Sequence, residues 1–199
     1  MPRMDGGVGL GDRVKLPLRF DPARLAADVA RMAAGDWIAH FVRRNYAGDW
    51  SVIPLRGPAG ATHPVLMIHP HPSARAFADA PALSEAPYLR EVLAGFLCPL
   101  QCVRLMRLGP GSAIEPHRDH DLDFEHGVAR IHVPVSTNPQ VEFRLNGTRV
   151  DMAPGEAWCL RLSDIHSVEN RGGAERVHLV IDAEVNDWLA ALMAAATPR

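Results

Sequence analysis

The stretch VARIHVPVSTNPQVEFRLNGTRVDMA, residues 128–153, alternates apolar and polar residues in short segments separated by Asn, Pro and Gly. A period of two is typical of half-buried β-strands, because successive side chains point to opposite faces of a sheet. Asn146 and Gly147 lie between two such segments, and both residues tolerate the positive φ that a type I′ turn requires. The stretch therefore predicts antiparallel β-structure with a tight hairpin at residues 146–147.

The same alternation extends from residue 101 to about residue 183. Further expected strands are QCVRLMRL (101–108), EAWCLRL (156–162) and ERVHLVID (175–182), with RVKLPLRF (13–20) and WSVIPLR (50–56) nearer the start. Helices are expected over DPARLAADVARMA (21–33), where Asp21 can cap and Pro22 fits the first helical position, over 88–96 and over about 184–195. This order predicts a mostly β protein, a small barrel or jelly roll with helices packed outside.

The chain length and composition favour one folded domain. A chain of 199 residues that is 47% hydrophobic can bury a sizeable core. Within that domain we expect an N-terminal region of helices and strands (1–100) that packs on the core, the β core itself (101–183) and a C-terminal helix (184–199).

Charge and cysteine content restrict the classes of partner. The 21 basic and 23 acidic residues give a net charge of −2, which provides no basic surface for nucleic acid. No apolar run approaches the ~20 residues of a membrane span, and the first residues lack the apolar segment of a secretion signal. The three cysteines lie in apolar surroundings and are expected to be buried free thiols. We therefore expect a cytoplasmic protein that acts on a small molecule or a peptide.

A candidate metal site begins in EPHRDHD, residues 115–121. His117 and Asp119 are two residues apart, so on an extended segment both side chains point the same way. His166 follows beyond several strands, and a barrel can return it to this pair. Two histidines and one carboxylate leave coordination positions open, which is the arrangement of Fe(II) oxygenases. The alternative is a polar turn, since the chain has ten histidines and the motif continues with His120 and Asp121.

Two expected strands each carry an Arg-x-His pair on one face. Arg176 and His178 lie on the last strand, and Arg130 and His132 lie on the strand at 128–135. Buried charges are costly unless they are paired, and the arginine fork suits the carboxylate of a dicarboxylic cosubstrate. The alternatives are that these faces meet solvent and that the two histidines are ordinary core residues.

Several of these segments, taken in order, resemble one enzyme family. The pieces IEPHRD, RIHVPV, GEAWCL, DIHSVEN and RVHLVID, between about residues 103 and 182, resemble the bacterial branch of the aspartyl/asparaginyl β-hydroxylases, which are Fe(II)/2-oxoglutarate dioxygenases. The resemblance implies a cupin-like double-stranded β-helix. It also implies a residue set, namely iron held by His117, Asp119 and His166, 2-oxoglutarate anchored by Arg176 beside His132, and Arg130 near a carboxylate of cosubstrate or substrate.

The resemblance further implies a dioxygenase that uses Fe(II), 2-oxoglutarate and O2 to hydroxylate an aliphatic carbon of an amino acid, free or within a small peptide. Arg104 and Arg130 are the expected substrate-binding residues. The chain departs from the animal hydroxylase at Met106, where that enzyme has a serine, and at Asp119, where that enzyme lacks the metal carboxylate. The alternatives from other classes are a cupin-like module that binds a metal or a carboxylate without turnover, and a purely structural jelly roll.

Overall fold

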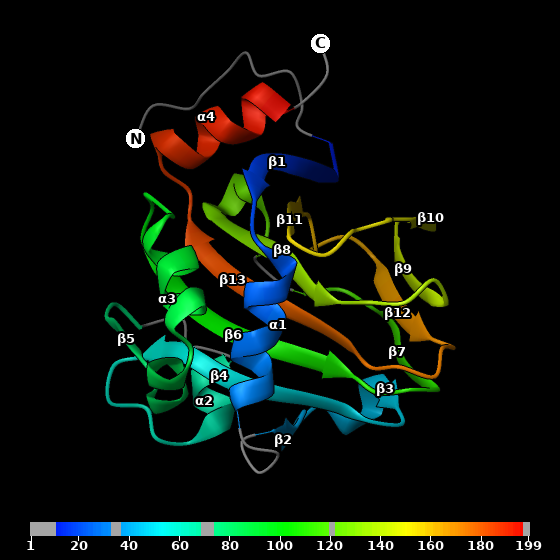
Figure 1. Cartoon of the computed structure of the whole chain (residues 1–199). Helices are drawn as coiled ribbons and strands as arrows, with labels where there is room; N and C mark the ends of the chain where they lie inside the picture. The colour runs from blue at the N-terminus through cyan, green and yellow to red at the C-terminus, as the bar shows by residue number, and fades with distance from the viewer. Residues whose placement is uncertain (1–10, 33–36, 69–73, 120–121, 197–199) are drawn as a thin grey trace.

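Two antiparallel β-sheets face each other in the computed structural model, which describes residues 11–32, 37–68, 74–119 and 122–196 (Figure 1). The larger sheet has eight strands: β1 (Arg13–Arg19), β11 (Glu156–Leu160), β8 (Val128–Ser136), β13 (Arg176–Glu184), β6 (Leu100–Leu108), β4 (Trp50–Pro58) and β2 (Ile38–Ala39) in spatial order, with β5 (Phe77–Asp79) also paired to β4. The smaller sheet is β10 (Thr148–Arg149), β9 (Val141–Leu145), β12 (His166–Asn170), β7 (Ser112–His117) and β3 (Tyr46–Ala47).

From β6 onward the chain crosses repeatedly between the two sheets. β6, β8, β11 and β13 belong to the larger sheet, and the intervening β7, β9, β10 and β12 belong to the smaller one. This alternation is a double-stranded β-helix, so the fold class expected from the sequence is confirmed. The first hundred residues supply β1 and β4 to the larger sheet, as well as helices that cover it.

The described residues form four α-helices beside the sheets: α1 (Pro22–Arg31), α2 (Pro64–Ile68), α3 (Pro87–Ala94) and α4 (Asp187–Ala196). Short 3-10 turns lie at 43–45, 81–85 and 124–126. In Figure 1, α1 and α3 lie side by side against the larger sheet, and α4 lies across the end near β1. Among the described residues, no helix is long and apolar enough to cross a membrane.

Most expected elements form where the pattern places them. The hairpin at Asn146 (φ 50°) and Gly147 (φ 74°) is confirmed, and Asp21 caps α1 by accepting hydrogen bonds from two backbone amides of the first turn. The last helix was expected from about Glu184, but that residue is the end of β13 and pairs with Val128, so the helix begins at Asp187. The expected strand after the hairpin is reduced to the two residues of β10.

The strands that carry the histidines of the candidate metal site were not among the expected strands. β7 reads SAIEPH and β12 reads HSVEN, and both are short and rich in polar residues. Their positions depend on pairing with each other and with β9, which the pattern within one strand does not reveal. The three cysteines, by contrast, are buried free thiols as expected.

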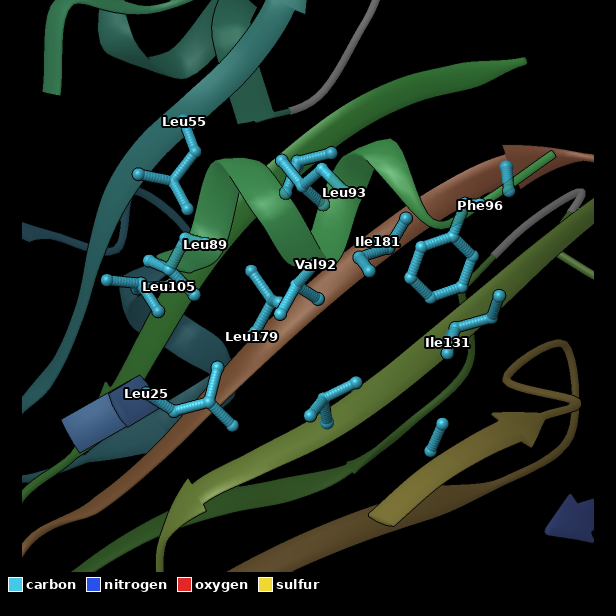
Figure 2. Close-up of a cluster of buried hydrophobic side chains, with 14 of the residues drawn as sticks. Leu25, Leu55, Leu89, Val92, Leu93, Phe96, Leu105, Ile131, Leu179 and Ile181 are labelled. Atoms are coloured by element: carbon cyan, nitrogen blue, oxygen red, sulfur yellow. The ribbon is translucent and has the colours of Figure 1, made fainter. Parts of the chain in front are cut away.

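The two faces of β13 have different chemistry, although both are buried. Val177, Leu179, Ile181 and Ala183 belong to the main apolar core, which the helices cover. Figure 2 shows Leu89, Val92 and Leu93 of α3 and Leu25 of α1 packed over Leu179 and Ile181 of this strand. Full burial of each such aliphatic side chain contributes roughly 1.5–3 kcal/mol. The opposite face of β13 carries the buried polar side chains of Arg176, His178 and Asp182, with Val180 among them.

A buried carboxylate joins the two helices on the outer layer. The N-cap residue of helix α3 is Ala86, whose methyl side chain cannot cap the first turn. Asp28 of α1, fully buried, instead accepts a hydrogen bond of 2.7 Å from the backbone N–H of Leu89 and pairs with Arg31. It therefore satisfies one of the unpaired N–H groups with which every helix begins.

A second buried carboxylate fastens β1 to β11. Glu156 accepts hydrogen bonds from Lys15 Nζ (2.5 Å), Arg19 Nη1 (2.9 Å), Trp158 Nε1 (2.9 Å) and the backbone N–H of Ala153 (3.0 Å). Burial disfavours its charged form, but these donors, Lys15 first among them, outweigh burial and lower the pKa of Glu156 to about 2. The folded protein therefore strongly favours the ionised carboxylate at this position.

The shift makes Glu156 a source of acid sensitivity. Its contribution to the free energy of unfolding is present above the ordinary pKa of 4.5 and is lost as the pH falls from 4.5 toward 2. We expect Glu156→Gln to reduce stability at about pH 7 by on the order of 2–3 kcal/mol, and to reduce it much less at about pH 3. Urea denaturation of both proteins across this range measures the difference. An equal loss at both pH values would contradict this role.

Candidate metal and carboxylate site

The three expected metal ligands converge between the two sheets. His117 and His166 are cross-strand partners on β7 and β12, and their ring centroids lie 4.2 Å apart. Asp119 lies two residues beyond the end of β7, where its N–H donates to the carbonyl of Leu162 (2.8 Å). One ligand atom from each of the three side chains lies within 4.8 Å of the others. His120 and Asp121, the rest of the motif, fall outside the described residues.

Backbone carbonyls fix which nitrogen of each histidine is available. His117 Nδ1 lies 2.8 Å from the carbonyl of Glu115, and His166 Nδ1 lies 3.0 Å from the carbonyl of Asp164. A carbonyl can only accept, so each Nδ1 carries a proton, and in the neutral imidazole the lone pair is then on Nε2. Asp119 Oδ1 lies 3.6 Å from His117 Nε2. This donor set of two imidazole nitrogens and a carboxylate oxygen fits a ferrous ion.

The electrostatic surroundings keep the donor set ready for a cation. Burial lowers the pKa of His166 to about 4, so its imidazole is neutral at physiological pH. Burial opposes ionisation of Asp119, but the surrounding charged groups, Arg130 first among them, together outweigh burial and keep the pKa of this carboxylate below its usual value. Each of these ligands is therefore in the form that binds a metal.

All seven expected site residues line one cavity of about 390 Å³: Arg104, His117, Asp119, Arg130, His132, His166 and Arg176. They come from both sheets, the arginines and His132 from the larger one and the two ligand histidines from the smaller one. The structure thus brings together residues that are spread over 73 positions of the chain, from Arg104 to Arg176. Their individual roles remain predictions.

Arg176 is a buried cation without a counterion. It is 3% exposed, its Nε has no hydrogen-bond partner, and its Nη2 donates to Nδ1 of His178 at 3.0 Å. No carboxylate of the described residues pairs with it, and burial lowers the pKa of its guanidinium to about 9. A buried charge is costly until it is paired, so this position favours binding of an anion.

The hydrogen bonds of Arg176 also determine the state of His132. Because Arg176 can only donate, His178 Nδ1 must accept; His132 Nδ1, 3.3 Å from it, is then the donor. His132 Nε2 is left as a buried acceptor without a partner in the structure. Burial, with the charge of Arg176 second, holds the pKa of His132 well below its ordinary value. His132 is therefore neutral and can accept one hydrogen bond from a ligand.

Arg104 and Arg130 are both paired with an aspartate that the sequence did not single out. Asp182 of β13, 3% exposed, accepts from Arg104 Nη1 (2.8 Å) and from Nε and Nη2 of Arg130 (2.6 and 2.9 Å). Arg130 Nη1 also donates to Asp119 Oδ2 (2.5 Å). These contacts use three of the five N–H groups of Arg130 and leave two for a ligand.

Aromatic side chains from the first fifty residues form another wall of the cavity. The ring of His40 stacks on Trp50 with centroids 3.6 Å apart and on Phe41 with centroids 4.9 Å apart. Burial, followed by the charge of Arg104, lowers the pKa of His40 to about 4. No pattern in the sequence singles out His40, because it lies far from the metal motif in the chain and outside any alternating strand pattern.

Together, the fold and the site define a double-stranded β-helix protein with a candidate metal site and a buried arginine without a counterion in one cavity. The sequence profile of the aspartyl/asparaginyl beta-hydroxylase family matches residues 25–185. The chain belongs to this family.

Relatives of known name are similar over most of this chain. L-proline cis-4-hydroxylase of Rhizobium meliloti (strain 1021) is 27% identical over 170 residues, which cover 84% of this chain and 59% of that protein. L-proline cis-3-hydroxylase 2 of a Streptomyces species is 28% identical over 174 residues, covering 83% and 57%. The chain therefore spans less than two thirds of the length of either relative.

A solved structure supports the fold. An oxidoreductase of the 2OG-Fe(II) oxygenase family from Burkholderia pseudomallei has a TM-score of 0.57 and 17% sequence identity to this chain, and the match covers 87% of this chain and 85% of that one.

The convergence of His117, Asp119 and His166 predicts the effect of removing a ligand. We expect His166→Ala and His117→Ala to lose Fe(II) binding while they keep the far-ultraviolet circular dichroism spectrum, because both side chains border a cavity. Asp119→Ala should also bind Fe(II) more weakly. Metal titration by calorimetry measures the loss, and His63→Ala, an exposed histidine outside the cavity, is the matched control. Full affinity in His166→Ala would exclude this site.

Proposed function

We propose that this protein is an Fe(II)/2-oxoglutarate-dependent dioxygenase that hydroxylates an aliphatic carbon of an amino acid, free or within a small peptide. The observation that carries the proposal is the pairing, in one cavity, of a His-Asp-His group with the unpaired buried cation of Arg176. A module that binds a metal alone would need the first feature but not the second. A module that also binds a carboxylate without turnover would share both features, and only the lack of a reaction would distinguish it.

In this proposal His117, Asp119 and His166 hold the iron and leave positions open for ligands. An iron ion held there would supply O2 activation coupled to conversion of 2-oxoglutarate to succinate and CO2, with one oxygen atom entering succinate and the other entering the substrate as hydroxyl. Arg176 binds the carboxylate of 2-oxoglutarate that is remote from the metal, through a charge-assisted fork. His132 lies beside the cosubstrate.

The charged groups between the two sheets support a carboxylate on the substrate as well as an anionic cosubstrate. Arg104, Arg130 and Arg176 against Asp119 and Asp182 leave one positive charge, and a ferrous ion adds two more. A dianionic 2-oxoglutarate neutralises two of these three charges. One carboxylate on the substrate would neutralise the third, and Arg104 and Arg130 are the residues that we propose bind it.

The proposed reaction is tested with a panel of amino acids and short peptides, starting with L-proline because two relatives bear its name. We expect consumption of 2-oxoglutarate and O2, formation of succinate, and a product that has gained one oxygen atom by mass spectrometry. If Arg104 and Arg130 bind a substrate carboxylate, the amide of each accepted amino acid should react at least about tenfold more slowly than the acid, a loss of ~1.4 kcal/mol.

Two outcomes of this panel would contradict the proposal. A dioxygenase of this kind should convert some 2-oxoglutarate even when no substrate is present. Iron binding without any such conversion would favour a non-catalytic module. Equal rates for acids and amides would remove the proposed substrate role of the two arginines and leave the dioxygenase assignment intact.

Arg176 provides a separate prediction about the cosubstrate. Arg176→Ala should weaken apparent 2-oxoglutarate affinity by roughly 2–5 kcal/mol, the range for a buried charge pair that loses one partner. Arg176→Lys should weaken it less, because lysine keeps the charge but lacks the planar fork. Steady-state kinetics at saturating iron measure both effects, with Arg44→Ala at the exposed edge of the same cavity as control. If Arg176→Ala kept the apparent affinity for 2-oxoglutarate unchanged, another residue would have to bind the remote carboxylate of the cosubstrate.

A further inference from the structure

Asp182 has no contact with the candidate metal ligands, yet it is joined to one of them through Arg130. It lies on β13, the central strand of the larger sheet, directly across from Arg130 of β8 in the antiparallel register. Both carboxylate oxygens bind Arg130, Oδ1 to Nε and Oδ2 to Nη2. A bidentate pair of this kind fixes the plane of the guanidinium as well as its position.

Because Nε and Nη2 are held by Asp182, the position of the remaining guanidinium nitrogen, Nη1, is fixed as well. Nη1 of Arg130 lies 2.5 Å from Oδ2 of Asp119. The other oxygen of Asp119, Oδ1, is the one that lies 3.6 Å from Nε2 of His117. Arg130 thus occupies one oxygen of the ligand carboxylate and leaves the other facing the histidines.

We propose that Asp182 is a positioning residue for the metal site: through Arg130 it holds Asp119 so that a single carboxylate oxygen is presented to the metal. The inference rests on the proposed function, since it assumes that Asp119 is a ligand. Contacts of this kind, which orient a ligand without touching the metal, typically change metal affinity by about 10–100-fold when they are removed.

A purely structural role for Asp182 must be separated from this one. Asp182 also binds Arg104 Nη1 at 2.8 Å, so its single negative charge is shared by Arg104 and Arg130. Asp182→Asn leaves Arg104, Arg130 and Arg176 facing Asp119 alone, and that variant is expected to be destabilised whether or not Asp182 positions Arg130.

The double variant Asp182→Asn/Arg104→Gln separates the two roles. It removes one negative and one positive charge, so the buried cluster keeps the net charge of the wild type while Arg130 loses its bidentate partner. Arg104→Gln alone is the matched control, because it leaves the pairs of Arg130 with Asp182 and Asp119 in place. Thermal unfolding reports stability, calorimetric titration with Mn(II) reports affinity, and the absorption spectrum of the Co(II)-loaded protein reports coordination geometry.

We expect the double variant to fold with a melting temperature close to that of Arg104→Gln. We expect it to bind Mn(II) about 10–100-fold more weakly than the wild type, whose cluster has the same net charge, and to show an altered Co(II) spectrum. Wild-type affinity and spectrum in the folded double variant would overturn the inference. Failure of the double variant to fold would also overturn it, because Asp182 would then hold the sheet together. A wild-type protein that binds no Mn(II) would instead overturn the proposed function.

Discussion

The alternation of side chains along β13 is the constraint on which the rest of this structure depends. One set of residues, which includes Leu179 and Ile181, lies in the apolar core under the helices, and the other set, which includes Arg176 and Asp182, faces the smaller sheet. Because the period of a strand is two, a shift of one residue would exchange the faces and bury charge under the helices. The packing of α1 and α3 therefore also fixes where the polar groups of the cavity lie.

The two sheets contribute different parts of the site. The smaller sheet places the two ligand histidines opposite each other, with their tautomers fixed by carbonyls only two residues away. The larger sheet supplies the arginines, and the register between β8 and β13 pairs Arg130 with Asp182. The same strands, β8 and β13, thus contribute apolar side chains to the core under the helices and arginines to the cavity between the sheets.

Much of this arrangement could be predicted from the sequence, because it depends on local patterns. Alternation and the Asn146-Gly147 turn predicted the β core, and the two-residue spacing of His117 and Asp119 predicted their approach. The polar strands β7 and β12 lack a strong apolar pattern, and Glu184 extends β13 only because Val128 pairs with it. Asp182 and His40 matter through cross-strand register and stacking, which are properties of the folded chain and not of any one segment.

The central claim is that one cavity binds iron through His117, Asp119 and His166 and binds 2-oxoglutarate at the same time. Anaerobic titration of the Fe(II)-loaded protein with 2-oxoglutarate, followed by visible absorption, tests it most directly, because chelation of iron by the keto acid produces a charge-transfer band. We predict a saturable band that succinate, which lacks the keto group, does not produce. Iron bound with no such band at saturating 2-oxoglutarate would contradict the account.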